Sequence, residues 1–283
     1  MKNLVKIEFS AEYFNVKDTL ECGQIFRFIP YKDGFKVYSK DKCAYCYNTQ
    51  KNAVIECDRQ DEEYFYNFFD LDRDYSEIYE QAKAQGVDIL KKAAEYGKGI
   101  RILNQDREET LFSFIVSQNN NIPRIKGIIE KLCLYLGDKK EFMGEEYFSF
   151  PKAQKMSERS QEFYKSIGLG YRAEYVRRLA ENINNGFNLE DLDKLNTEDL
   201  KKALLKIHGV GGKVADCVTL FGFKRSDSFP VDTWIEKVYR EDFNGGLTDR
   251  RKITEYFNER FKEYAGYFQQ YLFFYKRSGE KNI

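Results

Sequence analysis

The chain has 283 residues, which corresponds to about two domains at roughly 150 residues per domain. Its 46 Lys and Arg residues balance its 46 Asp and Glu residues, which excludes a strongly basic surface over the whole protein. Apolar residues make up 42% and charged residues 33%, a composition that is typical of a globular protein and excludes a disordered chain.

Targeting and membrane segments are not expected. No stretch is long and apolar enough for a membrane-spanning helix, so we expect no membrane partner. Lys6 and Glu8 interrupt the region that a secretion signal would need to keep apolar, so we expect a cytoplasmic protein. The six cysteines are too sparse for a disulfide scaffold.

Cys43 and Cys46 form a C-x-x-C pair. A structural zinc site usually needs four ligands, and the single histidine, His208, lies far along the chain. We therefore favour two thiols in a β-hairpin over a metal site, and expect no cofactor. The single histidine also argues against a Ser-His-Asp or Cys-His enzyme.

The N-terminal part of the chain predicts two β-hairpins. Residues 26–29 and 35–38 flank the turn pair Asp33-Gly34. Residues 43–47 and 53–57 form the second pair of strands. The sequence therefore begins with an antiparallel sheet.

Helices are predicted from about Asp61 onward, because apolar residues then recur at helical spacing, as in residues 111–115 and 125–132. No repeat of solenoid length is present. We expect an α+β fold, with an antiparallel β domain and flanking helices over residues 1–98 and an all-helical region over residues 99–283.

Charge is unevenly distributed along the chain. Between Lys201 and Arg225 there are six basic residues and one acidic residue, whereas between Asp58 and Asp74 there are seven acids and two arginines. A solvated helix face would explain a featureless basic segment. This one contains a run of glycines.

Residues 197–221 predict two short helices joined by Gly209, Gly211 and Gly212. Apolar residues recur at i, i+3, i+4 and i+7 on both sides of the glycines. Glycine permits positive φ and close approach of a ligand, and free N–H groups at the start of the second helix favour an anion such as phosphate. A plain helix-turn-helix corner is the alternative.

The pattern L-x-x-I-x-G-V-G-x-K-V-A-D, followed by F-P-V-D ending at Asp232, resembles the helix-hairpin-helix (HhH-GPD) DNA glycosylase superfamily. Within it, the chain resembles the 8-oxoguanine DNA glycosylase / AP lyase family. Further segments that carry the similarity are residues 22–27, 99–106, 111–124, 168–172 and 264–269. The resemblance implies a TBP-like N-terminal β domain and a helical region with the helix-hairpin-helix at residues 197–222.

Lys213 and Asp232 are the candidate catalytic residues. A lysine amine attacks only without its proton, and burial and the positive end of a helix both favour the neutral form. The resemblance implies that Lys213 attacks C1′ of the damaged nucleotide and forms a Schiff base, and that β-elimination then nicks the strand. Asp232 would stabilise the positive charge that develops on the sugar. The plainer roles are a phosphate contact for Lys213 and a helix N-cap for Asp232.

The resemblance also implies a set of residues around an everted base. The backbone carbonyl of Gly23 would accept from the N7–H that 8-oxoguanine has and guanine lacks. Gln269 would bind the pairing edge, and Phe273 and Cys217 would cover the two faces. Core packing is the alternative for Phe273, because neighbouring residues are also aromatic.

On the DNA side, the resemblance implies that Asn119 fills the space left by the everted nucleotide and that Tyr171 acts as a wedge. Arg124 and Arg172 would donate to the orphaned base, which we expect to be cytosine. A polar loop that ends a helix is the alternative for Asn119. Trp234 departs from the family pattern, in which we expect histidine, so a phosphate contact there is in doubt.

The sequence therefore predicts a monomeric, DNA-associated enzyme whose partner is double-stranded DNA containing 8-oxoguanine. Two alternatives stay open. One is a glycosylase for another damaged base, such as an alkylated purine. The other is a catalytically silent helix-hairpin-helix protein that only binds DNA.

The basic glycine-rich segment predicts salt-dependent DNA binding. Because each phosphate contact releases counterions, affinity for duplex DNA should fall linearly on a logarithmic scale as salt rises. Fluorescence anisotropy with a labelled duplex over a salt series measures the slope. A flat response would contradict phosphate anchoring by this segment.

Overall fold

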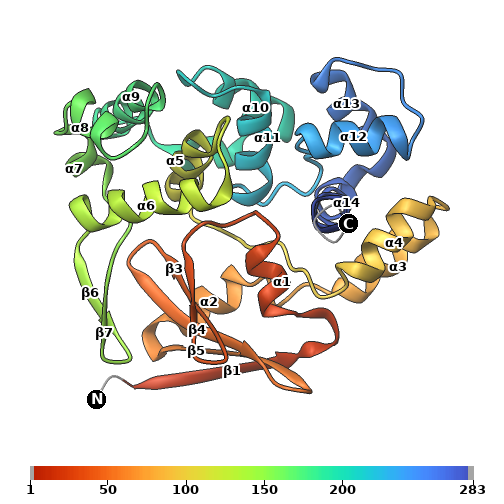
Figure 1. The fold of residues 1–283 in the computed structure, drawn as a ribbon, viewed down its shortest axis with the longest axis horizontal. Helices are drawn as coiled ribbons and strands as arrows, with labels where there is room; N and C mark the ends of the chain where they lie inside the picture. The colour runs from red at the N-terminus through yellow and green to blue at the C-terminus, as the bar shows by residue number, and fades with distance from the viewer. Residues whose placement is uncertain (1–2, 280–283) are drawn as a thin grey trace.

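A computed structural model describes residues 3–279, which form a β layer and a helical body above it (Figure 1). The strands are β1 (Leu4–Ser10), β2 (Phe28–Tyr31), β3 (Gly34–Ser39), β4 (Lys42–Asn48), β5 (Asn52–Asp58), β6 (Lys139–Phe142) and β7 (Glu145–Phe148). The helices are α1 (Val16–Glu21), α2 (Glu62–Phe68), α3 (Tyr75–Ala84), α4 (Asp88–Tyr96), α5 (Arg107–Ser117), α6 (Ile122–Leu136), α7 (Ala153–Ser157), α8 (Gln161–Ser166), α9 (Arg172–Asn184), α10 (Thr197–Leu205), α11 (Gly212–Phe221), α12 (Thr233–Glu241), α13 (Arg250–Phe261) and α14 (Ala265–Gly279). Within residues 3–279, no helix has the length and apolar character needed to cross a membrane.

Among the described residues, β1 to β5 form one antiparallel sheet in the order β1-β5-β4-β3-β2. The two predicted hairpins are confirmed as β2–β3 and β4–β5. The first turn lies at Lys32 and Asp33, one residue earlier than expected, because Tyr31 pairs with Gly34. β1 was not foreseen, although Val5, Ile7 and Phe9 alternate as a strand requires and β1 pairs with β5 along its length.

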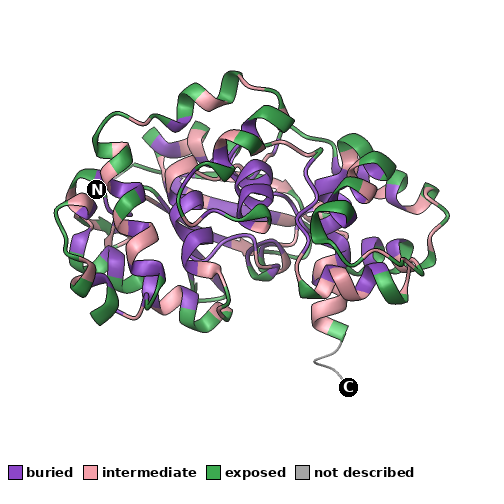
Figure 2. Cartoon of the chain, turned by 90° about the horizontal axis from the view of Figure 1, so that it is seen from above, coloured by how far each residue is buried: buried purple, intermediate pink, exposed green. Residues whose placement is uncertain are grey.

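Apolar side chains gather in two main cores. Figure 2 shows buried residues toward the middle of the molecule and exposed residues on the outer turns and loops. Helices α1 and α2 contribute to the core beneath the sheet. Helices α3 and α4 precede residue 98, yet their buried side chains join the helical core, where α4 packs on α14. The division after residue 98 therefore stays a prediction. Because α1 and α2 already cover the sheet, α3 and α4 bury their apolar faces against the C-terminal helix.

Arg101 is buried at the junction between the two cores and binds the loop carbonyls there. Its side chain is fully buried, and its guanidinium carbon lies 4.0 Å from the centroid of the Tyr75 ring. Nε donates to the carbonyl of Phe69 at 2.9 Å, and Nη2 donates to the carbonyl of Arg73 at 3.0 Å. A buried arginine thus supplies donors to loop carbonyls that would otherwise lack a partner.

Gln24 extends this junction toward the N-terminal loop. Its Nε2 donates to the carbonyl of Arg101 at 2.8 Å, and its Oε1 accepts from the backbone N–H of Leu103 at 2.8 Å. Both atoms are buried. The backbone beside Gly23 is therefore held rigidly against the segment that leads into α5.

We predict that Arg101→Met lowers the free energy of unfolding by about 3 kcal/mol or more, because more than one buried carbonyl loses its donor at roughly 1–3 kcal/mol each. Urea denaturation measures the loss. The matched control is Arg159→Met, which removes an exposed arginine and should change stability by less than about 0.5 kcal/mol. Equal stabilities of the two variants would contradict this role for Arg101.

Candidate active site

One small cavity gathers residues from five separate parts of the chain. It lies where the loop after α1, helix α5, helix α11, the segment before α12 and helix α14 meet. Its lining is Gly23, Phe114, Lys213, Cys217, Phe221, Pro230, Asp232, Gln269, Gln270 and Phe273. The structure therefore brings together all six residues that the sequence nominated for catalysis and base recognition.

The helix pair α10–α11 forms where the sequence predicts it. Asn196 caps α10 by accepting from the N–H of Asp199 at 2.9 Å. Gly209 has a φ of +86°, and a Cβ there would stand 2.3 Å from the Tyr175 ring, so only glycine fits. Gly211 and Gly212 are exposed, with no protein atom within 4 Å of a Cβ position, so their backbone is open to a ligand from outside.

Lys213 stands in the first turn of α11 and is half-buried. Its Nζ lies 5.0 Å from the centroid of the Phe114 ring, and that ring stacks on Phe221 at 5.6 Å. Burial raises the pKa of the neighbouring Cys217 thiol to about 11, although the positive charge of Lys213 opposes the shift. Cys217 is thus a neutral, apolar wall, and the amine of Lys213 stays the candidate nucleophile of the cavity.

Asp232 is the N-cap of α12. Its Oδ1 accepts from the backbone N–H groups of Trp234 and Ile235, each at 3.0 Å. Burial raises the pKa of the Asp232 carboxyl above its ordinary value, while the two N–H groups and the charge of Lys213 oppose that shift. The carboxylate is therefore held in place by the helix end and interacts electrostatically with the amine, so capping and charge stabilisation are compatible.

Gly23 adopts a φ of +94°, and a Cβ on it would stand 2.8 Å from Nη1 of Arg277 and 3.1 Å from the Phe273 ring. The loop is anchored on its other side by Gln270, whose Nε2 donates to the carbonyl of Cys22 at 2.9 Å. Sequence reasoning missed Gln24 and Gln270 as supports of this loop. The available signal was a pair of adjacent glutamines in an otherwise aromatic helix.

Gln269 and Phe273 project from one face of α14 because they are four residues apart. Gln269 is only 5% exposed, and its Oε1 has no hydrogen-bond partner. The cavity in front of these residues has a volume of about 40 Å³, which is far too small for a purine. This is a closed form of the pocket, and a base enters only if a wall such as the half-buried Phe273 moves.

The loop between α5 and α6 carries Asn119, which is exposed with a φ of +45°. Its Nδ2 lies 3.2 Å from the hydroxyl of Tyr171, a half-exposed ring. The adjacent Gln118 donates from Nε2 to the carbonyl of Gly209 at 2.9 Å. The nominated DNA-facing loop and the glycine hairpin are thus directly joined.

Arg124 and Arg172 differ in their surroundings. Arg124 is exposed, and its Nη2 donates to the carbonyl of Gly168 at 3.3 Å. Arg172 is buried, with Nε 2.7 Å from the carbonyl of Gln118 and Nη2 2.9 Å from that of Asn119. Arg172 therefore holds the Asn119 loop, and its contact with an orphaned base stays a prediction.

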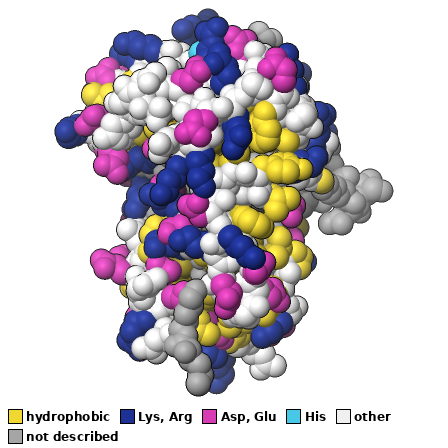
Figure 3. Space-filling model, turned by 90° about the vertical axis from the view of Figure 1, so that its left-hand side faces the viewer, with side chains coloured by type: hydrophobic (Ala, Val, Ile, Leu, Met, Phe, Trp, Pro, Cys, Tyr) yellow, Lys and Arg dark blue, Asp and Glu magenta, His cyan; other side chains and the backbone are white. Residues whose placement is uncertain are grey.

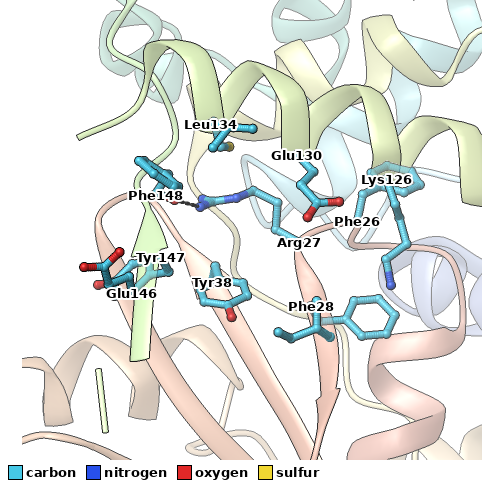
Figure 4. Close-up of a pocket in the computed structure, with 12 residues that line it drawn as sticks. Phe26, Arg27, Phe28, Tyr38, Lys126, Glu130, Leu134, Glu146, Tyr147 and Phe148 are labelled. Carbon is cyan, nitrogen blue, oxygen red and sulfur yellow. Dashed lines mark hydrogen bonds between the residues drawn. The ribbon is translucent and has the colours of Figure 1, made fainter. Parts of the chain in front are cut away.

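A larger cavity of about 300 Å³ lies between β2, β3, α6 and the β6–β7 hairpin (Figure 4). Arg27 lines it, donating to the carbonyl of Phe148 at 2.7 Å and pairing with Glu109 at 3.1 Å. Nζ of Lys126 lies 3.5 Å from the centroid of the Phe28 ring. None of the residues nominated from the sequence lines this cavity. The smaller one is the candidate active site because it holds all six residues nominated for catalysis and base recognition.

The face seen in Figure 3 is not uniformly basic. On the face seen in Figure 3, Lys and Arg side chains alternate with Asp and Glu side chains over both the helical part and the sheet. This agrees with the formal net charge of zero. Recognition of a polyanion therefore depends on local groups such as the open hairpin backbone.

Comparison with known proteins places these features in a family. The model of the 8-oxoguanine DNA glycosylase N-terminal domain matches residues 6–111, and that of the HhH-GPD superfamily base excision DNA repair protein matches residues 112–263. The chain is 30% identical over 262 residues to the N-glycosylase/DNA lyase OGG1 of Arabidopsis thaliana, covering 85% of this chain and 67% of that protein.

Solved structures agree over almost the whole chain. The Clostridium acetobutylicum 8-oxoguanine glycosylase/lyase, in complex with double-stranded DNA containing cytosine opposite 8-oxoG, has a TM-score of 0.90 and 34% identity, with 100% of both chains covered. MBOgg1 in complex with a low affinity DNA ligand has a TM-score of 0.93 and 35% identity, covering 98% of this chain and 96% of that one.

The raised pKa of Asp232 predicts how the rate of base release changes on the acid side of its pH profile. Below that pKa the carboxyl is neutral and stabilises no cation, so base release should rise with pH through a value above that of an exposed aspartate. Single-turnover excision across pH measures this. Asp232→Asn keeps a good N-cap but no charge, so it should slow release about a hundredfold at an unchanged melting temperature. Release at the wild-type rate in this variant would contradict the electrostatic role.

Proposed function

The chain belongs to the HhH-GPD superfamily of base excision DNA repair proteins, and we propose that it is a bifunctional glycosylase and AP lyase that removes 8-oxoguanine from duplex DNA. The observation that carries the proposal is the single cavity that holds Lys213 and Asp232 beside Gly23, Gln269 and Phe273. One chain supplies all these groups, so the proposed site needs no residue from a second subunit.

The target atom C1′ is inaccessible within stacked duplex DNA, so the damaged nucleotide is flipped out. The neutral amine of Lys213 then attacks C1′. A C–N bond to the lysine forms as the glycosidic bond breaks, and the bonding electron pair leaves with the base, which takes up a proton. Asp232 stabilises the positive charge that builds up on the sugar.

The covalent intermediate explains the lyase step. The sugar ring opens to a protonated Schiff base between Lys213 and C1′, which makes the C2′ protons acidic. Loss of one such proton expels the 3′ phosphate and nicks the strand, and water then releases the lysine. The position of the Lys213 amine beside Phe114 supports this route, because burial keeps the proton on the thiol of Cys217, which also lines the cavity.

The base is recognised by the groups around it. The carbonyl of Gly23 accepts from N7–H of 8-oxoguanine and repels the N7 lone pair of guanine. Gln269 supplies its unpartnered Oε1 to the pairing edge. Phe273 and Cys217 cover the two faces of the ring, and a base stack of this kind contributes about 1–3 kcal/mol.

The surrounding loops hold the duplex open. Asn119 fills the vacated space, and Tyr171 wedges the stack. Arg124 and Arg172 donate to the orphaned base, and a pair of guanidinium groups favours cytosine because O2 and N3 of cytosine both accept. The exposed backbone at Gly211 and Gly212 binds phosphate.

We predict that Lys213→Gln abolishes borohydride trapping on duplexes containing 8-oxoguanine while leaving duplex affinity within about threefold, since it removes the amine but little of the interface. The matched control is Lys91→Gln, on the exposed face of α4, which should trap normally. The assay places 8-oxoguanine opposite each of the four bases and includes an alkylated purine.

Preferential release of the alkylated purine would overturn the substrate assignment. Trapping of the Lys213→Gln variant at the wild-type level would contradict the assignment of Lys213 as the nucleophile. If the wild-type protein formed no adduct on any lesion, the remaining hypothesis would be a catalytically silent protein that only binds DNA.

A further inference from the structure

Arg277 lies at the edge of the cavity and has no part in the function described so far. It follows Gln269 and Phe273 at four-residue intervals, so the three side chains share one face of α14. Its guanidinium carbon is 5.1 Å from the centroid of the Phe273 ring. Its Nη1 stands 2.8 Å from the position of a Cβ on Gly23. The guanidinium therefore lies directly against the Gly23 backbone.

The hydrogen-bonding capacity of Arg277 is only partly used. Nη2 donates to the carbonyl of Glu21, whereas Nη1 is buried and has no hydrogen-bond partner. Burial lowers the pKa of Arg277, and nearby groups that include Asp232 oppose the shift. A buried donor without a partner is costly, so a persistent one indicates an acceptor that arrives with a ligand.

A second unpartnered polar atom lies on the same helix face. Oε1 of Gln269 is a buried acceptor without a donor, two helical turns before Arg277. Phe273 stands between them as a flat apolar surface. An acceptor, a ring and a donor in this order match a heterocycle that presents N–H groups at one edge and a carbonyl oxygen at the other.

We propose that Arg277 is a further base-recognition residue, whose Nη1 donates to a carbonyl oxygen of the everted base next to the N7–H bound by Gly23. This rests on the proposed function. In 8-oxoguanine, N7–H is flanked by the carbonyl oxygens at C6 and C8, so a donor beside Gly23 meets an acceptor on either side. The contact presses that edge onto the Gly23 carbonyl, where guanine is repelled.

A phosphate is the less suitable acceptor for this group. Phosphates of bound DNA remain at the protein surface, whereas Nη1 is buried beside the cavity wall. An abasic site separates the two cases experimentally, because it retains the phosphates and lacks the base.

The test compares Arg277→Met, which keeps a long apolar stem, with wild type. Single-turnover release of 8-oxoguanine opposite cytosine should fall about tenfold to a hundredfold, the effect of losing one charge-assisted hydrogen bond. Nicking of the same duplex with a preformed abasic site should stay at the wild-type rate. Arg159→Met, which removes an exposed arginine far along the chain, should match wild type in both assays.

Arg277→Lys keeps a donor but not the planar group over Phe273, so it should recover part of the release rate. Equal losses in the Met and Lys variants, or an equal loss on the abasic duplex, would overturn the contact with the base. If wild type excises 8-oxoguanine and Arg277→Met releases it at the same rate, the role of Arg277 is refuted and the proposed function stands. Failure of the wild-type protein to release 8-oxoguanine would instead refute the proposed function.

Discussion

The proposed chemistry of this protein depends on one constraint: an amine must lie in a partly desolvated place, near an aromatic ring and within electrostatic reach of a carboxylate. The start of α11 provides the place, since Lys213 occupies its first turn and Phe114 lies under the Nζ atom. A cation at the positive end of a helix is unfavourable for folding alone. The carboxylate of Asp232, held at the N-terminus of α12, offsets that cost and is the group that the proposed mechanism uses to stabilise positive charge on the sugar.

Around the cavity, some buried polar side chains have all their hydrogen bonds made and others have an atom without a partner. Gln24 and Gln270 are buried with their hydrogen bonds made, and they hold the Gly23 loop. Gln269 and Arg277 are next to them and keep one buried atom each without a partner. Hydrogen-bonded supports therefore surround two unpartnered polar atoms, which is the arrangement that the proposed base pocket needs.

The loop nominated to face DNA is coupled to the helix pair by hydrogen bonds from side chains to backbone carbonyls. Gln118 joins the Asn119 loop to Gly209, and Arg172 fixes the same loop from α9. The groups nominated for phosphate binding and for filling the duplex therefore belong to one rigid unit. Since the chain has no net charge, this local unit is what a duplex must engage.

Local features could be predicted from the sequence because neighbouring residues encode them. The two N-terminal hairpins follow from alternation and turn residues, and the helix pair follows from two apolar stripes broken by Gly209. Lys213 and Asp232 are nominated by a short motif that resembles the helix-hairpin-helix glycosylases, and a motif of consecutive residues can be read without knowledge of distant packing.

The rest was decided by contacts between segments that are far apart in the chain. Gly23 and Arg277 meet only because α14 packs beside the loop that follows α1. The periodicity of a sequence does not encode which helix packs against which loop. The aromatic sequence of α14 predicts a core helix and conceals the face that carries Gln269. The closed volume of the pocket and the burial of Arg172 are likewise properties of packing, since both depend on how side chains from separate elements share one space.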